Sequence, residues 1–447
     1  MKTPLCDFVR GYARENKLRL HMPGHKGISG AEHLSAAPFD LTEINGADVL
    51  YDASGVIAQS QENARALFGS GKTLYSAEGS SLCIRAMVYL TVLYAKERGE
   101  APLIYAARNA HKAFALAAAT MNVTVKWLFP TQTQGLVRCD LSPARLDEVL
   151  TSAEKKPTAV YLTSPDYLGN VADVKGLSAI CKKHGVLLLV DNAHGAYLRF
   201  LPQDCHPITL GADAACDSAH KTLPVYTGGA YLHLSPNAPA AFYQAAQTAM
   251  ATFASTSPSY LILQSLDGAN AYLSDTYRQK LAAFLPKVRA LKDALAHFSP
   301  QGEEELKLTL APKAYGYTGN QLAQVLQENG IVCEFSDPDY CVMMLSPELE
   351  EKDLTHLQTV LCALPQKQAI VEQPPALVAP KVGLSMQQAL FSPAQEIATE
   401  QALGRVLASP TVSCPPAVPV VVCGETIDSA ALACFAYYGI KTCRVVK

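Results

Sequence analysis

The sequence contains no long apolar run and carries little net charge. Its formal net charge is −3 over 447 residues, so electrostatics give no reason to expect nucleic acid or an anionic membrane as a partner. No apolar run reaches the roughly 20 residues of a membrane-spanning helix, and the first residues lack the charged-then-apolar pattern of a secretory signal. We therefore expect a cytoplasmic protein with neither of these partners.

The cysteines and histidines show no disulfide or metal-binding pattern. There are 13 cysteines, an odd number, and no two form a Cys-x-x-Cys pair, which favours reduced thiols over disulfides or a zinc site. His21 and His25 could pair on a helix, but Pro23 between them is incompatible with that helix. We expect no metal. The segment that contains His21 and His25 predicts instead an ordered loop. This loop would reach an anionic substrate or cofactor, within one subunit or across a dimer interface.

Apolar residues make up 49% of the chain and charged residues 17%, which predicts a soluble globular protein with a large core. Short apolar stretches alternate with helical patterns, and the stretches are 73–76, 103–106, 123–128, 159–163 and 186–190. Strands and helices that alternate in this way indicate βαβ units, so we expect an α/β fold with a mostly parallel sheet.

The rest of the chain predicts smaller parts. Strand-like stretches near 306–312, 331–335 and 342–345, with a helix near 320–328, predict a small α+β domain. A proline-containing linker at 366–380 precedes a tail with helices expected at 392–398 and 429–439 and a strand at 418–422. We expect an N-terminal arm over 1–35, a large domain over 36–285, the small domain over 286–370, and a linker with a C-terminal α/β domain over 371–447.

A lysine with reactive surroundings stands in the stretch from Asp213 to Pro224. Lys221 follows a segment of small residues, is flanked by Ser218 and His220, and is expected on a loop that leaves a strand. Such a lysine can form a Schiff base with a carbonyl cofactor, for which pyridoxal phosphate (PLP) is the usual candidate. Taken alone the pattern is weak, since Ser-x-His-Lys also arises by chance.

A carboxylate upstream strengthens this interpretation. Asp191 follows the apolar run Val186–Val190 and so falls at the carboxyl end of a buried strand, where open α/β sheets bind ligands. PLP needs a carboxylate facing its pyridine nitrogen, because the protonated ring is the better electron sink. The alternative is that Asp191 caps a following helix.

A possible phosphate site precedes the helix that begins near Ser80. The order strand, Gly79-Ser80-Ser81, helix places free backbone N–H groups and a positive dipole end where an anion can bind. A plain serine cap is the alternative, and Glu78 would repel a phosphate unless it is turned away. His111 also stands at a strand end, where its imidazole could stack on a pyridine ring or simply cap a helix.

These stretches together resemble the Orn/Lys/Arg decarboxylase family. The resemblance rests on seven motifs between Arg19 and Asp267, in family order: His-Met-Pro-Gly-His-Lys-Gly, Gly-Ser-Ser, Arg-Asn-x-His-Lys, Ser-Pro-x-Tyr-x-Gly, Asp-x-Ala-His-Gly-Ala, Ser-x-His-Lys-Thr-Leu-Pro and Ser-Thr-Ser-Pro-Ser-Tyr. A tail with Ser-x-Pro-Pro-x-x-Pro and Gly-Glu is similar to the family's C-terminal domain. The resemblance implies a PLP-dependent, transferase-like large domain of the aspartate aminotransferase fold type.

The resemblance also implies residue roles. Lys221 would hold PLP as an aldimine, Asp191 would pair with the pyridinium, His111 would stack on the ring, and His194 would lie beneath it. The phosphate would be bound by Gly79, Ser80, Ser81, Ser218 and His220, with Thr256 or Ser257 reaching in from a partner subunit. Glu425, Tyr167 and His25 would face the substrate. His220, beside the lysine, completes the expected catalytic set.

The expected activity is decarboxylation of arginine, lysine or ornithine to agmatine or a diamine, by a homodimer or a multiple of dimers. Other PLP reactions on the same fold, such as β-elimination or transamination, stay open, as does a PLP-binding protein without turnover. Residues that depart from the family pattern stand at several substrate-facing positions, and they are Glu78, Leu168, Asn192, Cys414 and Cys423.

Overall fold

The computed structural model describes residues 1–15, 17–28, 34–130, 141–376, 378–413 and 419–447. It is an α/β protein with a large, mostly parallel sheet, as the sequence predicts. The chain divides into two compact units, Met1–Glu100 with Leu187–Gln279, and Ala101–Val186 with Lys280–Lys447. The four segments expected from the sequence stay a prediction.

The first unit contributes four strands of the large sheet in the order β1-β7-β6-β5. Their bounds are Lys72–Ser76 for β1, Leu187–Asp191 for β5, Ala214–Asp217 for β6 and Ala230–Leu234 for β7. Strands β5 and β6 are parallel, whereas β7 runs antiparallel to both β6 and β1. Every residue of β5, β6 and β7 is buried, which explains why β5 lies in a continuous apolar run.

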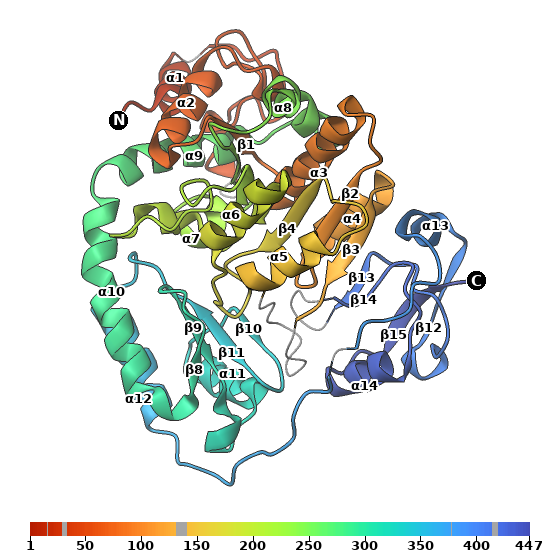
Figure 1. The fold of residues 1–447 in the computed structure, drawn as a ribbon. Coiled ribbons are helices and arrows are strands. Elements are labelled where there is room, and N and C mark those ends of the chain that lie inside the picture. Colours follow the sequence, from red (N-terminus) through yellow and green to blue (C-terminus); the bar gives the residue numbers. More distant parts are fainter. Residues whose placement is uncertain (16, 29–33, 131–140, 377, 414–418) are drawn as a thin grey trace. The chain divides into compact units, whose positions relative to one another are not determined.

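The helices of the first unit pack on these strands and on one another (Figure 1). They are α1 (Pro4–Arg14), α2 (Val56–Phe68), α3 (Ser80–Glu97), α7 (Ala219–Thr222), α8 (Ala240–Phe253) and α9 (Tyr260–Ser274), with 3-10 turns at Ala37–Phe39, Leu50–Asp52 and Ala196–Phe200. Helix α3 is apolar around most of its circumference, and α8 covers it.

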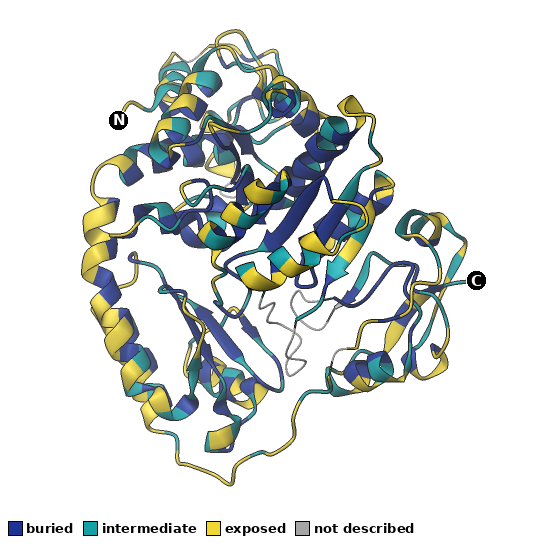
Figure 2. Cartoon of the chain, in the orientation of Figure 1, coloured by how far each residue is buried: buried dark blue, intermediate teal, exposed yellow. Residues whose placement is uncertain are grey.

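The second unit contributes three parallel strands in the order β4-β2-β3. They are β2 (Leu103–Ala107), β3 (Thr124–Leu128) and β4 (Ala159–Thr163). Figure 2 shows β2 and β4 dark blue, whereas exposure alternates along β3, as expected for an edge strand with one solvated face. Their connecting helices are α4 (Lys112–Thr120), α5 (Pro143–Thr151) and α6 (Val174–His184).

The second unit also contains the expected small α+β part. Its antiparallel sheet has the order β10-β11-β9-β8, formed by β8 (Pro300–Gln301), β9 (Lys307–Leu310), β10 (Phe335–Ser336) and β11 (Cys341–Met344). Helices α11 (Gly319–Glu328) and α12 (Glu351–Cys362) accompany it, with 3-10 turns at Ala296–Phe298 and Pro312–Tyr315. Helix α10 (Tyr277–Ala294) leads into this part from the first unit.

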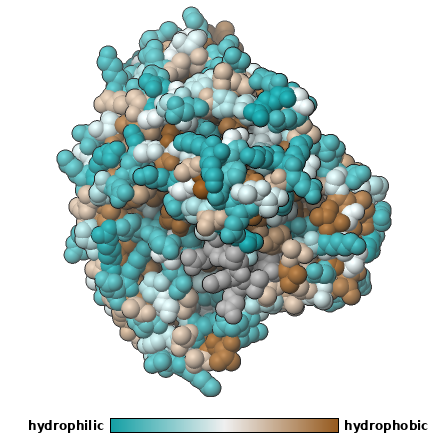
Figure 3. Space-filling model, viewed as in Figure 1, coloured by the Kyte–Doolittle hydropathy of each residue, from teal (hydrophilic) through white to brown (hydrophobic). Residues whose placement is uncertain are grey.

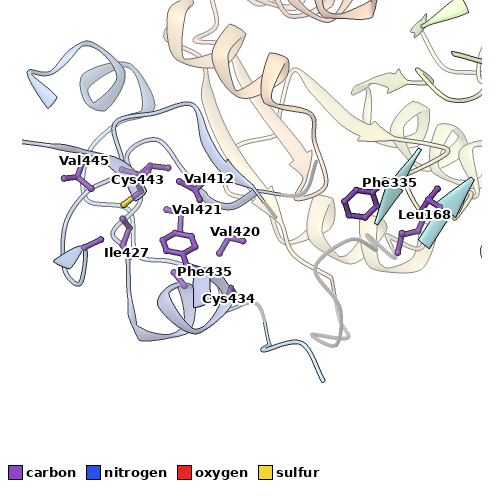
Figure 4. Close-up of a cluster of buried hydrophobic side chains, with 14 residues drawn as sticks. Leu168, Phe335, Val412, Val420, Val421, Ile427, Cys434, Phe435, Cys443 and Val445 are labelled. Carbon is purple, nitrogen blue, oxygen red and sulfur yellow. The ribbon is translucent and has the colours of Figure 1, made fainter. Parts of the chain in front are cut away.

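The C-terminal segment contributes to a buried apolar cluster of the second unit that also includes Leu168, Phe335 and Val342. Its elements are α13 (Met386–Phe391), β12 (Ala394–Ala398), a 3-10 turn (Thr399–Gln401), β13 (Thr411–Ser413), β14 (Pro419–Val422), α14 (Ser429–Tyr437) and β15 (Thr442–Val446). Val420, Val421, Ile427 and Phe435 are among the buried residues that gather beside α14 (Figure 4). Exposed apolar side chains, including Phe391 and Leu403, also occur in this segment, and Figure 3 shows it with brown patches.

One element of this segment was predicted wrongly. The stretch 392–398 was expected to be helical, but β12 occupies Ala394–Ala398 and pairs antiparallel with β15. The helix ends before it, because Ser392 is already extended and Pro393 follows. Tertiary pairing with a strand about 50 residues later then overrides the local preference. Among the described residues, no helix is both long and apolar enough to span a membrane.

Candidate cofactor site

Lys221 lies in a one-turn helix rather than on the expected loop. Helix α7 begins directly after β6 and Ser218, and the backbone N–H of Lys221 donates to the carbonyl of Ser218. The Nζ atom of Lys221 lies 3.1 Å from Nε2 of His194. His194 is only 4% exposed, so a buried imidazole stands beside the lysine amine.

Asp191 ends strand β5 and is 2% exposed. Its Oδ1 accepts the backbone N–H of Ala193 at 3.2 Å and faces the thiol of Cys216 at 3.5 Å. The next helical turn starts at Ala196 and has Gly195 in the capping position. Asp191 is therefore a buried carboxylate at a strand end and does not cap a helix.

The start of helix α3 forms a small polar cradle. Gly79 precedes the helix with φ of +70°, a left-handed conformation that favours glycine, and a Cβ atom there would lie 4.0 Å from His220. Ser80 is the first helical residue, and its hydroxyl accepts a hydrogen bond from Ser218 at 2.8 Å. Ser81 is half-buried in the same turn. The helix dipole and these hydroxyls favour an anion at this end.

Glu78 does not oppose an anion there, because its carboxylate has a partner elsewhere. Its Oε1 accepts the backbone N–H of Ser255 at 2.7 Å. This contact anchors the loop between α8 and α9, on which Thr256 and Ser257 are exposed. Their predicted contact with a second subunit therefore stays a prediction.

His220 adds a neutral imidazole to the cradle. Its Nδ1 donates to the carbonyl of Gly229 at 3.0 Å, which leaves Nε2 as the acceptor. Burial, and then the charge of Lys221, lower the pKa of His220 below its ordinary value. At neutral pH, His220 is therefore an uncharged ring that can accept a proton or a hydrogen bond.

These residues fit PLP by the chemistry of their donors. The first unit contains a lysine amine beside an imidazole, a buried carboxylate and a hydroxyl-lined helix start. A carbonyl, a pyridine nitrogen and a phosphate require groups of these three kinds. All three groups lie at or just after the carboxyl end of a strand of the first unit. These strands are β6 for the lysine, β5 for the carboxylate and β1 for the helix start.

The other predicted residues of the second unit have partners within that unit. His111 occupies the N-cap of α4, where its Nδ1 accepts the backbone N–H of Ala113 at 3.2 Å. Tyr167 follows β4 and donates its hydroxyl to Glu334 at 2.6 Å. The capping alternative for His111 is thus observed, and its stacking on a ring stays a prediction, as does the contact of Tyr167 with substrate.

Glu425 is a buried residue with a cationic partner inside the chain. It is 4% exposed, and Arg108 donates to both of its carboxylate oxygens at 2.7 Å. Its proximity to the end of a substrate stays a prediction, and the observed role is structural. Arg108 was visible in the Arg-Asn-x-His-Lys motif, but nothing local in the sequence indicates its partner.

The remaining predicted substrate residue, His25, lies in the first unit. His25 is half-buried, with Nε2 3.2 Å from Asp40 and Nδ1 accepting the N–H of Gly27 at 3.0 Å. Of the residues that depart from the family pattern, Leu168 and Cys423 are buried in apolar clusters. Cys414 lies outside the described residues.

The sequence interpretation missed one polar cluster, formed by His206, Asp217 and His233. All three side chains are fully buried, and their potential ligand atoms lie within 4.8 Å of one another. Asp217 directly precedes Ser218, and its position shortly before Lys221 was the only local indication that it belongs to a functional cluster. The two histidines come from separate segments and have no motif.

Comparison with known proteins identifies the family. The model described as "Orn/Lys/Arg decarboxylase, major domain" matches residues 3–309. The uncharacterized protein YaaO of Bacillus subtilis is 29% identical, over 96% of this chain and 92% of that protein. An arginine decarboxylase of Halalkalibacterium halodurans is 27% identical, over 97% of this chain and 92% of that protein.

The fold agrees with this assignment. The crystal structure of a lysine decarboxylase from Francisella novicida superposes with a TM-score of 0.79 at 16% identity, and covers 100% of this chain and 81% of that chain. At this identity the match shows the fold alone. With the family model spanning most of the chain, the protein belongs to the Orn/Lys/Arg decarboxylase family of PLP-dependent amino-acid decarboxylases.

Proposed function

We propose that this protein decarboxylates a basic amino acid, with arginine as the first candidate and lysine and ornithine as the others. The observation that carries the proposal is the 3.1 Å contact between the Lys221 amine and His194. It lies in the unit that also contains the buried Asp191 and the cradle at α3. Arginine comes first because a relative that matches almost the whole chain is named an arginine decarboxylase.

PLP supplies an electron sink that lets a carboxylate leave as carbon dioxide. The residues of this chain divide the remaining tasks. Lys221 provides the amine for covalent attachment, and Asp191 keeps the pyridine nitrogen protonated. Ser80, Ser218 and the N-terminus of α3 bind the phosphate. His194 lies close enough to the Lys221 amine to exchange a proton with it, so this pair is the proposed source of the proton returned to Cα.

A direct assay tests this proposal. Purified protein with PLP is incubated separately with arginine, lysine and ornithine, and carbon dioxide and the product amine are measured. We expect stoichiometric carbon dioxide and amine from one basic amino acid. Formation of an oxoacid without carbon dioxide, with the amino group retained on the cofactor in its pyridoxamine form, would establish transamination, and PLP binding without any product would establish a non-catalytic protein.

We further propose that the protein works as a homodimer. A cavity of about 500 Å³ in the first unit opens between the N-terminal arm and α9 and is lined by Arg10, Phe39, Tyr226 and Tyr272, among others. Tyr226 lies beside this cavity and is 64% exposed. Because burial of an aromatic ring stabilises an interface, we place the dimer contact at this face. Tyr226→Arg should shift the mass in analytical ultracentrifugation from dimer toward monomer. An unchanged dimer would exclude this face as the interface.

A further inference from the structure

A buried anion and two imidazoles lie behind the predicted cofactor residues of the first unit. Oδ2 of Asp217 is 3.0 Å from Nε2 of His206 and 3.3 Å from Nε2 of His233. None of the three side chains is exposed at all. The ring of Phe68 packs against both imidazoles, so the cluster is enclosed by apolar surface.

The hydrogen bonds distinguish a network from a metal site. Nδ1 of His206 accepts the backbone N–H of Ile208 at 3.3 Å, so the ring proton lies on Nε2 and is donated to Asp217. A metal would need that nitrogen unprotonated. On the other side, Nδ1 of His233 lies 2.8 Å from the hydroxyl of Thr73, which in turn contacts Ser70.

The charges of the cluster are set by its burial. Burial alone would raise the pKa of Asp217, but the two imidazoles outweigh it and hold that pKa well below its ordinary value. Burial lowers the pKa of His233. Asp217 is therefore an anion at neutral pH, and a buried anion needs hydrogen-bond donors on both of its oxygens.

The second oxygen of Asp217 reaches the cofactor residues. Oδ1 accepts the side-chain N–H of Asn192 at 2.7 Å, and Asn192 directly follows Asp191. The backbone N–H of Asn192 also donates to the carbonyl of Cys216. Asp217 therefore ties the ends of β5 and β6 together beyond their last paired residues, Asp191 and Cys216. It also immediately precedes Ser218 of the phosphate cradle.

We propose that Asp217 is a positioning residue for the cofactor, which as a buried anion shared by His206, His233 and Asn192 holds the turn after Asp191 and the start of the Ser218–Lys221 segment in place. The inference rests on the proposed roles of Asp191 and Lys221. It adds that the geometry of both depends on one carboxylate that does not itself touch the cofactor.

The variant Asp217→Asn tests the charge at nearly constant shape. The amide oxygen of the substituted side chain can still accept a hydrogen bond from Asn192. Its N–H groups, however, face the Nε2–H of His206, so two donors oppose each other in a buried site. Such a clash lowers the equilibrium constant of any process that requires the native arrangement, PLP binding included, by about tenfold or more. We expect the affinity of the cofactor-free protein for PLP, followed by fluorescence quenching, to fall about tenfold. The absorption maximum of bound PLP should shift, and kcat should fall while KM stays near its original value.

Asp267→Asn is the matched control, because Asp267 is an equally buried carboxylate of the same unit that accepts the N–H groups of Leu5 and Cys6 instead. Its stability should fall without a change in PLP affinity or spectrum. If both variants lose stability alike and neither changes PLP affinity or spectrum, Asp217 is only structural and the proposal is wrong.

A second pair of variants protects the test against misfolding of Asp217→Asn. His206→Gln keeps a side-chain N–H for Asp217 and should retain most of the PLP affinity, whereas His206→Leu removes the donor and should lose it. Equal affinities for the two variants would contradict the proposal. This comparison does not require turnover, so it stands even if no basic amino acid is decarboxylated.

The ring protons can be observed directly without cofactor. In protein labelled with ¹⁵N-histidine, the resonances of His206 should show the proton on Nε2, and that signal should be lost in Asp217→Asn. A proton on Nδ1, or a stoichiometric divalent metal retained through purification, would overturn the network and make the cluster a metal site.

Discussion

Arg108 and Glu425 form a bidentate ion pair inside the second unit. Both Nη atoms of Arg108 lie 2.7 Å from a carboxylate oxygen of Glu425, and the two side chains are only 1% and 5% exposed. Arg108 also donates to the carbonyls of Pro419 and Val420. The positive charge of Arg108, just after β2, is thus neutralised by Glu425. The guanidinium is also held in place by backbone carbonyls of β14.

We expect Glu425→Gln to destabilise the protein. Removing one partner leaves the guanidinium of Arg108 buried without its counter-charge, which costs about 3–5 kcal/mol. Urea denaturation measures the loss. Glu100→Gln is the control, since Arg98 and Glu100 form an exposed pair worth less than about 1 kcal/mol. Normal stability of Glu425→Gln with a severalfold higher KM for the basic substrate would assign Glu425 to substrate recognition.

Lys221→Ala should abolish covalent attachment of PLP. Borohydride treatment of the original protein should fix the cofactor on Lys221, and peptide mapping identifies the modified residue. Lys72→Ala is a suitable control, because Lys72 is a half-buried lysine on β1 whose pKa is lowered by burial. Cofactor fixed on any lysine other than Lys221 would show that the site is assigned incorrectly.

Asp191→Asn should retain PLP and lose turnover. The amide cannot stabilise a protonated ring nitrogen, so the electron sink weakens in the transition state. We expect kcat to fall at least about 100-fold, the scale typical for removal of one electrostatic stabiliser. Asp173→Asn alters a carboxylate that does cap a helix and should turn over normally. Near-normal kcat in Asp191→Asn would refute the pairing with the ring.

Asp166 should make the stability of the protein depend on pH. Burial raises the pKa of Asp166 to about 6, although hydrogen bonds from Asn170 and the charge of Lys307 oppose this. The native state therefore keeps the proton to a higher pH than the unfolded chain, so this residue's contribution to the free energy of unfolding decreases as pH rises from about 4 to about 6.

Relative to that of the original protein, the free energy of unfolding of Asp166→Asn should rise by about 2 kcal/mol between pH 4 and pH 7, because the pKa of Asp166 is 3.8 in the unfolded chain and about 6 in the native protein. Urea denaturation at several pH values measures this difference. A difference for Asp166→Asn that does not vary with pH would mean that its pKa is not raised.

The positions of Asp191 and Ser80 in the fold were predictable because each occupies a short, recognisable stretch at a strand end, whereas their contact with the cofactor stays a prediction. The run 186–190 indicates a buried strand and therefore places Asp191 at its end, and Gly79-Ser80 indicates the start of α3. The apolar pattern lies within each stretch, so a single sequence is sufficient to predict these elements. The same reasoning predicted the α/β fold with its mostly parallel sheet.

What could not be predicted depends on pairing between distant segments. Arg108 and Glu425 are separated by 317 residues, and each alone is consistent with an exposed charge. His206 and His233 likewise meet Asp217 only after the strands are assembled. The stretch 392–398 was misjudged for the same reason, because the partner that makes β12 a strand is at the end of the chain.

The first unit is built from two stretches of chain with 86 residues of the second unit between them. During synthesis, α3 emerges with eleven buried residues to cover, but its partner α8 begins only at Ala240. At translation rates of about 5–20 residues per second, this delay is roughly 7–30 s. Throughout that interval α3 lacks the helix that covers it in the folded protein, so the core of the first unit can be completed only after the chain has been synthesised through Phe253.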